Sequence, residues 1–125
     1  MRMRLARLAD QYINIGGPTS TPYNEMISEG VPVNVRASRS FRQYFHPLAF
    51  LEGVQIRRLK KEINYAAKHH EMYHIWWHPH NLGADIEKNL NKLESILQCY
   101  KECHEKYGMQ PYNMSEIKDL IINNR

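Results

Sequence analysis

The sequence has little cysteine and no long hydrophobic run, and both shortages limit what the protein can be. Its two cysteines, Cys99 and Cys103, lie four positions apart in a helical pattern, where parallel Cβ directions disfavour a disulfide bridge. No stretch approaches the ~20 apolar residues of a membrane span. No continuous apolar segment follows the charged N-terminus, as a secretory signal requires. Free thiols and the missing signal favour a cytoplasmic location.

A dense basic surface is also absent, which argues against a nucleic-acid partner. The formal net charge is +4, and the basic residues are spread along the chain. The one dense cluster falls in a helical pattern and is expected to form a solvated helix face, because a nucleic-acid site needs a broader stripe. With 125 residues, 42% of them hydrophobic, the chain is at most one domain. The basic cluster consists of Arg57, Arg58, Lys60 and Lys61.

Hydrophobic periodicity predicts an α/β chain that is mostly helical, with about two short strands. Asp85 and Ser115 are the expected N-caps of the last two helices, and Gly108 suits the position after the longest one. The elements alternate as in α/β proteins, but two strands cannot close a sheet. The first helix begins without a cap or lead-in, as a truncated element or an alternative start codon would produce. The expected helices cover residues 2–13, 54–69, 85–107 and 116–123, and the expected strands cover residues 31–35 and 72–77.

The segment over residues 36–45 mixes arginines with aromatic residues and has no clear period, so it is expected to be irregular. Two interpretations of its arginines stay open. They either bind an anionic or glycan substrate or form structural ion pairs with Glu25, Glu29 or Glu52, and the ion pairs are favoured. The arginines are Arg36, Arg39 and Arg42.

The most informative stretch runs from Tyr73 to Leu82 and reads Tyr-His-Ile-Trp-Trp-His-Pro-His-Asn-Leu. It contains both tryptophans of the chain and leads from large apolar residues into a polar turn. This pattern indicates a buried strand whose end opens onto a site, and an α/β barrel places its chemistry at such strand ends. His78 ends the strand, and a histidine there can pass protons near neutral pH. A structural histidine is the default alternative.

The tryptophans and the neighbouring histidines have further interpretations. Trp76 and Trp77 should point to opposite faces of the strand. One of them could stack on a sugar ring, while core packing of both is favoured. His74, His78 and His80 would share a face with Trp76, and three histidines can bind zinc. Because their spacing is not diagnostic, no metal site formed by this chain alone is expected.

Together these residues resemble a known family. The stretch from His74 to Leu82, between two helices, is similar to the last conserved motif of the polysaccharide deacetylases (the NodB-type domain, carbohydrate esterase family 4). The resemblance covers roughly residues 5–118, and the His-Ile-Trp-Trp-His-Pro-His-Asn string is its fairly specific part. The supporting segments are Ser38-Arg39-Ser40-Phe41-Arg42, Arg57-Arg58-Leu59, Ala66-Ala67-Lys68, and Asn89-Leu90 with Leu93 and Ile96-Leu97.

The resemblance implies a fold and a chemistry. The family folds as a distorted (β/α) barrel and removes acetyl groups from N-acetylated glycans, usually with a divalent metal whose bound water attacks the acetamide carbonyl. By position, His78 matches the histidine that protonates the leaving amine, and Trp76 matches the apolar residue that lines the acetyl pocket. The family's Asp-Asp and His-x-x-x-His motifs, which supply the base and the metal ligands, have no counterpart here. The divalent metal is therefore expected only for the complete enzyme.

Two functional interpretations follow from the sequence. In the first, residues 1–125 are a single partial domain, the C-terminal part of such a barrel hydrolase, and are inactive alone. In the second, the chain is a non-enzymatic α/β module or a degenerate fragment that binds a partner or a glycan. Exposed apolar edges left by a missing barrel would favour self-association.

Overall fold

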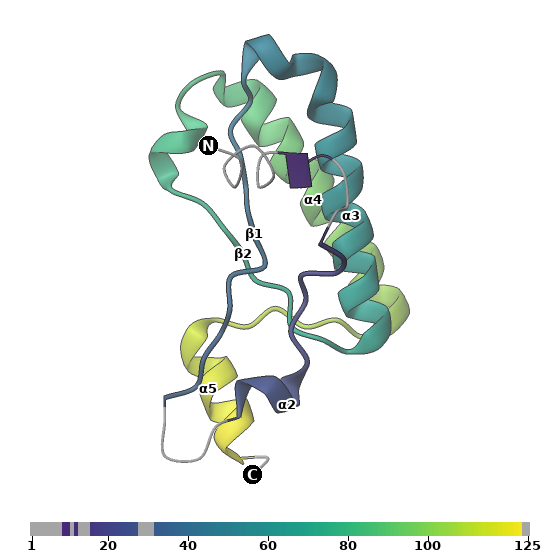
Figure 1. Cartoon of the computed structure of the whole chain (residues 1–125), viewed down its shortest axis with the longest axis vertical. Helices are drawn as coiled ribbons and strands as arrows, with labels where there is room; N and C mark the ends of the chain where they lie inside the picture. The colour runs from purple at the N-terminus through teal and green to yellow at the C-terminus, as the bar shows by residue number, and fades with distance from the viewer. Residues whose placement is uncertain (1–8, 11, 13–15, 28–31, 124–125) are drawn as a thin grey trace.

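The computed structural model describes residues 9–10, 12, 16–27 and 32–123. Two long helices, α3 and α4, run side by side, two extended segments pair beside them, and the short helix α2 lies with α5 at the opposite end of the molecule (Figure 1). In chain order the elements are α2 (Tyr23–Met26), β1 (Arg39–Ser40), the 3₁₀ helix η1 (His46–Leu51), α3 (Glu52–His69), β2 (Ile75–Trp76), the 3₁₀ helix η2 (Pro79–Leu82), α4 (Ile86–Tyr107) and α5 (Met114–Asn123).

The main hydrophobic core lies where α3 packs against α4. Leu59 and Ile63 of α3 are buried there against Ile96 of α4 and Phe41, which directly follows β1. Burying side chains of this kind contributes about 1.5–3 kcal/mol each. Because Phe41 belongs to this core, the end of β1 is fixed against both long helices.

The two strands pair in parallel, with Arg39 opposite Ile75 and Ser40 opposite Trp76. The pairing extends one residue further, since the Phe41 N–H donates to the Trp76 carbonyl at 2.8 Å. η1 and α3 form the connection between the strands, so β1, α3 and β2 make a βαβ unit. The expected class, mostly helical α/β with about two short strands, is confirmed.

The positions of the strands differ from the expectation. The expected strand over 31–35 is absent from residues 32–35, and β1 forms instead within the segment over 36–45 that lacks a clear period. Val33 and Val35 pack against the small core between α2 and α5, so their alternation reflects contact with helices rather than strand pairing. The expected strand over 72–77 shortens to β2. The expected helix over 2–13 lies outside the described residues, apart from 9, 10 and 12.

The bounds of the two long helices agree with those predicted from hydrophobic periodicity, whereas the predicted N-cap of α5 is wrong. α3 and α4 match the expected 54–69 and 85–107 within two residues at each end, and Gly108 follows α4 with a φ of 71°. Asp85 occupies the N-cap position without a capping hydrogen bond from its side chain. The cap of α5 is Asn113 rather than Ser115, because Asn113 and Glu116 exchange hydrogen bonds of 2.7 and 3.0 Å in a capping box. No helix in the described ranges is long and apolar enough to cross a membrane.

The buried face of α4 is polar in the first half of the helix, and part of the apolar stripe of α4 is exposed. Ile86, Leu90 and Leu97, which belong to its heptad-like apolar stripe, are 48–55% exposed. The face turned toward α3 begins with polar residues and becomes apolar further along. Its buried residues are Asn89, Lys92, Ile96, Cys99 and Cys103.

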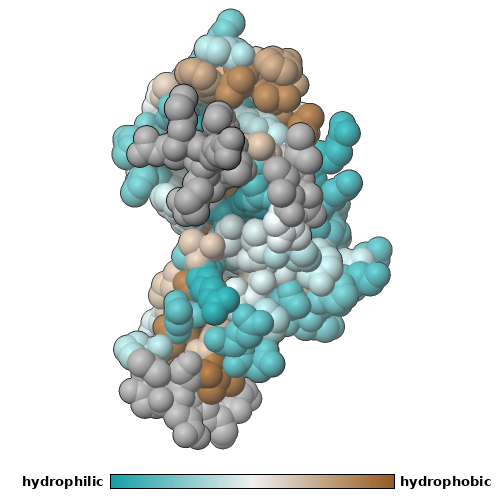
Figure 2. Space-filling view, in the orientation of Figure 1, coloured by the Kyte–Doolittle hydropathy of each residue, from teal (hydrophilic) through white to brown (hydrophobic). Residues whose placement is uncertain are grey.

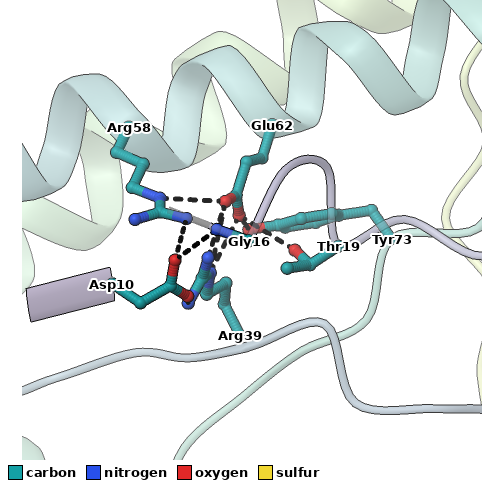
Figure 3. Close-up of polar contacts among 7 residues, drawn as sticks. All are labelled: Asp10, Gly16, Thr19, Arg39, Arg58, Glu62 and Tyr73. Carbon is teal, nitrogen blue, oxygen red and sulfur yellow. Dashed lines mark hydrogen bonds and ion pairs between the residues drawn. The ribbon is translucent and has the colours of Figure 1, made fainter. Parts of the chain in front are cut away.

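A buried cluster of charges joins β1 to α3 (Figure 3). Arg39 of β1 donates to Glu62 of α3 through Nε and Nη2 at 3.0–3.2 Å, and to Asp10 through Nη1 at 2.9 Å. Arg58 lies one turn before Glu62 and donates to the same two carboxylates at 3.1 and 3.3 Å. The Tyr73 hydroxyl, which precedes β2, donates to Glu62 at 2.9 Å. The cluster therefore connects the segments before both strands, β1 itself and α3.

The charges of this cluster shift one another's pKa values. Burial by itself would raise the pKa of Glu62, but the hydrogen bond and charge of Arg39, with the bonds from Tyr73 and Arg58, lower it below its ordinary value. Burial opposes the charge of Arg39, and its hydrogen bonds to Glu62 and Asp10 outweigh that effect, so its pKa is raised. Burial and the nearby Glu62 raise the pKa of Tyr73, which keeps its hydroxyl a donor.

These contacts settle two expectations about basic residues. The solvated-face interpretation holds for the exposed Arg57 but is wrong for Arg58, whose side chain is 7% exposed. The ion-pair interpretation is confirmed for Arg36, which pairs with Glu25 at 3.3 Å. Arg39 also forms structural ion pairs, but its partners are Glu62 and Asp10 rather than the expected glutamates.

Glu62→Gln should destabilise the fold strongly. The change leaves Arg39 and Arg58 buried with too little opposing charge, which costs about 3–5 kcal/mol. The control is Glu25→Gln, which removes the exposed partner of Arg36 and should cost about 0–1 kcal/mol. Urea unfolding followed by circular dichroism measures both, and equal shifts of the two midpoints would contradict the role given to the buried cluster.

The lowered pKa of Glu62 also predicts sensitivity to acid. The folded protein holds the Glu62 proton less tightly than the unfolded chain, where the pKa is near the ordinary 4.5. Its stabilisation is therefore present above that value and is lost as the pH falls through the lower folded pKa. Urea midpoints measured from about pH 7 to about pH 3 should decline in the acid range, and the decline should be smaller in Glu62→Gln. Parallel profiles would refute the assignment.

Candidate functional site at the end of β2

A hollow of about 250 Å³ lies where β2 turns into η2. Residues 40–43, which continue from β1, line one side, and residues 76–78 with Asn81 of η2 line the other. Because β1 and β2 are parallel, their carboxyl ends meet at this edge, as in α/β folds that carry chemistry at strand ends. The structure thus brings Trp76 and His78 to one space and adds the segment over 40–43, of which the sequence had indicated only Arg42 as a substrate-binding candidate.

His78 lies at this hollow with an exposed side chain. Its ring centroid is 5.4 Å from that of Trp76 in an edge-on contact, and 5.3 Å from that of His80, with the two imidazoles nearly parallel. Its backbone carbonyl accepts a 2.9 Å hydrogen bond from the Asn81 N–H, which closes the turn after the strand. An accessible imidazole beside an apolar ring can exchange a proton with a bound molecule near neutral pH.

His74 is separate from this group. It lines a different cavity of about 630 Å³, and its Nδ1 is buried without a hydrogen-bond partner among the residues that the structure describes. Of the four side chains expected to share a face, the structure brings Trp76, His78 and His80 together and places His74 at another cavity.

Neither tryptophan is a core residue. Trp76 is 40% exposed and Trp77 is 37% exposed, so the favoured interpretation of core packing for both is wrong. The two rings have different neighbours, because Trp77 lies 5.9 Å from the ring of Phe41 while Trp76 contacts His78. This agrees with the opposite directions of successive strand side chains. Trp76 consequently offers an apolar surface next to the imidazole.

Asn89 of α4 supports the hollow from behind. Its side chain is fully buried, and its Oδ1 accepts a hydrogen bond from the Tyr44 N–H at 2.6 Å. Its amide nitrogen donates to the carbonyls of Leu82 and Ala84, at the end of η2. One side chain therefore ties the segment after β1 to the turn after β2, the two walls of the hollow.

Lys92, one turn further along α4, holds the same wall. Its Nζ donates to the Arg42 carbonyl at 2.8 Å, to Glu52 at 2.8 Å and to Gln55. Burial lowers the pKa of Lys92, and the charge and hydrogen bond of Glu52 partly offset that effect. Sequence reasoning missed Asn89 and Lys92, although their spacing from Ile96 places all three on one helix face.

The part of the chain that the structure describes has no set of side chains that could bind a metal ion. There, no three histidine, cysteine, aspartate or glutamate side chains lie close enough together to hold a metal ion. These residues do not fit the divalent metal that the family resemblance implies, so no step through a metal is assigned to them. Cys99 and Cys103 are free and buried. Burial and the neighbouring Cys103 raise the pKa of Cys99 to about 11, which leaves it a protonated, weak nucleophile.

Comparisons with known proteins give no match to this chain. No protein-family model matches it, and neither does any curated protein or any solved structure. The interpretation of the hollow therefore depends on its own geometry and on the resemblance of its residues to a family motif.

Asn89→Ala should destabilise the protein and loosen the hollow. The Tyr44 N–H loses its acceptor, and an unsatisfied buried polar group costs about 1–3 kcal/mol. Asn91→Ala, at an exposed position of the same helix, is the matched control and should have little effect. Urea unfolding followed by the fluorescence of Trp76 and Trp77 measures both. Equal midpoints for the two variants would contradict the supporting role of Asn89.

Proposed function

We propose that this chain is the C-terminal part of a polysaccharide deacetylase-like hydrolase that removes N-acetyl groups from glycans. The hollow at the end of β2 is the observation that best supports the proposal, because Trp76 and His78 line one space of about 250 Å³. An N-acetyl group joins an apolar methyl to a polar amide. The ring of Trp76 suits the methyl, and the imidazole of His78 suits the amide.

His78 is the proton donor in this proposal. Hydrolysis of an amide breaks its C–N bond, and the nitrogen leaves readily once it gains a proton. Histidine can supply that proton near neutral pH, and the exposed ring of His78 lies at the hollow. Trp76 lines the acetyl pocket. The groups that activate the nucleophile are not found among the described residues, so this chain alone should not deacetylate.

The arrangement of the strands supports a barrel as the complete fold. A parallel strand, a helix and a second parallel strand are the repeating unit of a (β/α) barrel, and β1, α3 and β2 follow that order. The exposed apolar stripe of α4 suits a helix that has a further packing partner in the complete protein.

The second candidate is a non-enzymatic interaction module. Hydrophobic side chains gather on the surface over η1 and the start of α3, at the end of the molecule away from α5 (Figure 2). Phe50 is 77% exposed there, with Phe45 at 53% and Val54 at 39%. Exposed apolar patches mark interaction surfaces or association between copies. Light scattering after size exclusion discriminates between the two candidates. A clean monomer argues against an incomplete barrel and favours a self-sufficient domain, as the second candidate requires.

Substitution of His78 in the complete enzyme tests the catalytic assignment. His78→Ala should lower turnover by about 10²–10⁴-fold, the usual contribution of a general acid. Trp76→Ala should disturb substrate positioning. His80→Ala removes only the stacked neighbour, should do less, and is the control. Turnover and Tm are measured on the same preparation, because a structural role predicts lower Tm with nearly intact specific activity. Unchanged turnover in folded His78→Ala would refute the assignment.

The genomic sequence upstream of Met1 gives an independent test. An Asp-Asp motif and a paired-histidine motif should occur within about a domain length, roughly 100–150 residues. If both motifs are missing, the interpretation as part of an enzyme fails.

A further inference from the structure

Asn81 carries a buried polar atom that no role described so far explains. Its Oδ1 is one of two buried side-chain atoms without a hydrogen-bond partner among the described residues. Buried acceptors are nearly always paired, because removing them from water without a partner is costly. An unpaired amide oxygen next to a hollow therefore points to a partner that the chain itself does not provide.

The position of Asn81 is fixed relative to His78. The Asn81 N–H donates to the His78 carbonyl at 2.9 Å, and η2 holds both residues in one turn. Asn81 lines the same hollow as Trp76 and His78. Turning the Asn81 amide toward the hollow breaks no hydrogen bond of Oδ1 with the described residues. The oxygen is therefore available to a bound molecule.

We propose that Asn81 is a substrate-positioning residue that accepts a hydrogen bond from the amide N–H of an N-acetyl group. The inference rests on the proposed function and adds the contact that positions the amide nitrogen. Trp76 suits the methyl, and Asn81 holds the nitrogen on the side of the hollow where His78 lies. Selectivity for the acetylated sugar comes from Trp76, because the deacetylated sugar has no methyl and its ammonium group can still donate to Asn81.

Ligand binding by this chain tests the proposal without requiring activity. Trp76 and Trp77 are its only tryptophans, so their fluorescence reports on the hollow directly. The probes are a trimer of N-acetylglucosamine and its fully deacetylated counterpart. The acetylated trimer should bind more tightly. Asn81→Leu should weaken its binding by about 3- to 10-fold, the worth of one hydrogen bond.

Two further variants keep the test decisive. Asn81→Ala removes the amide without adding bulk and replaces Asn81→Leu if that variant does not fold. Asn81→Asp keeps an acceptor and should retain binding within about 3-fold. Asn91→Leu, at an exposed position of α4, is the control for surface changes, and Tm is measured for every variant.

The outcomes separate this inference from the proposed function. If the unaltered chain binds neither trimer, the proposed function fails and the inference fails with it. If the acetylated trimer binds and Trp76→Ala weakens it, while the folded Asn81→Leu or Asn81→Ala variant binds normally, only the role of Asn81 is refuted. Equal affinity of the unaltered chain for both trimers refutes the acetyl pocket at Trp76, and the proposed function with it.

Discussion

The buried pairing of Arg39 with Glu62 is the constraint on which the arrangement of this chain depends. β1 contains two residues, too few for its own ladder to fix a register. Arg39 is the first of them, and its guanidinium is held on α3 by Glu62 and on the N-terminal segment by Asp10. A buried ion pair contributes little net stability compared with apolar packing. We infer that its main effect here is to specify one register, with Arg39 opposite Ile75.

That register determines where the hollow forms. Once Arg39 is fixed, Phe41 enters the core between α3 and α4, and the next residues come within hydrogen-bond distance of the first half of α4. Asn89 and Lys92 then bind the backbone of this segment at Tyr44 and Arg42. Polar contacts to α4 thus hold the segment after Phe41, which forms one wall of the hollow. Apolar contacts of Phe41 hold the end of β1. A geometry fixed by directed hydrogen bonds suits a site, because it leaves the exposed side chains free to meet a ligand.

The sequence predicted the parts of this structure that local pattern determines. The long periods of α3 and α4 gave their bounds, and the string around His78 indicated a site at the end of a strand. β1 was not predictable, because its two residues become a strand only by pairing with a segment far along the chain. Asn81 and Asn89 were missed for a similar reason. Their significance lies in which backbone groups or hollow they meet, and neither residue type nor spacing reveals that before the chain is folded.

The exposed part of the apolar stripe of α4 is the last feature that a proposed function must explain. A helix at the surface of a self-sufficient domain normally buries its apolar stripe and exposes its polar residues. The second half of α4 buries Ile96, Cys99 and Cys103 in this way. Its first half instead buries Asn89 and Lys92, while Ile86 and Leu90 are about half exposed. The polar residues are accounted for by the hollow that they support, but the exposed stripe has no such role within the described residues. A fold arranged in this way has its site on one side of α4 and an apolar surface suited to a partner on the other. In the barrel hydrolase this stripe would meet the rest of the barrel, whereas the interaction module would use the exposed residues over η1 and the start of α3.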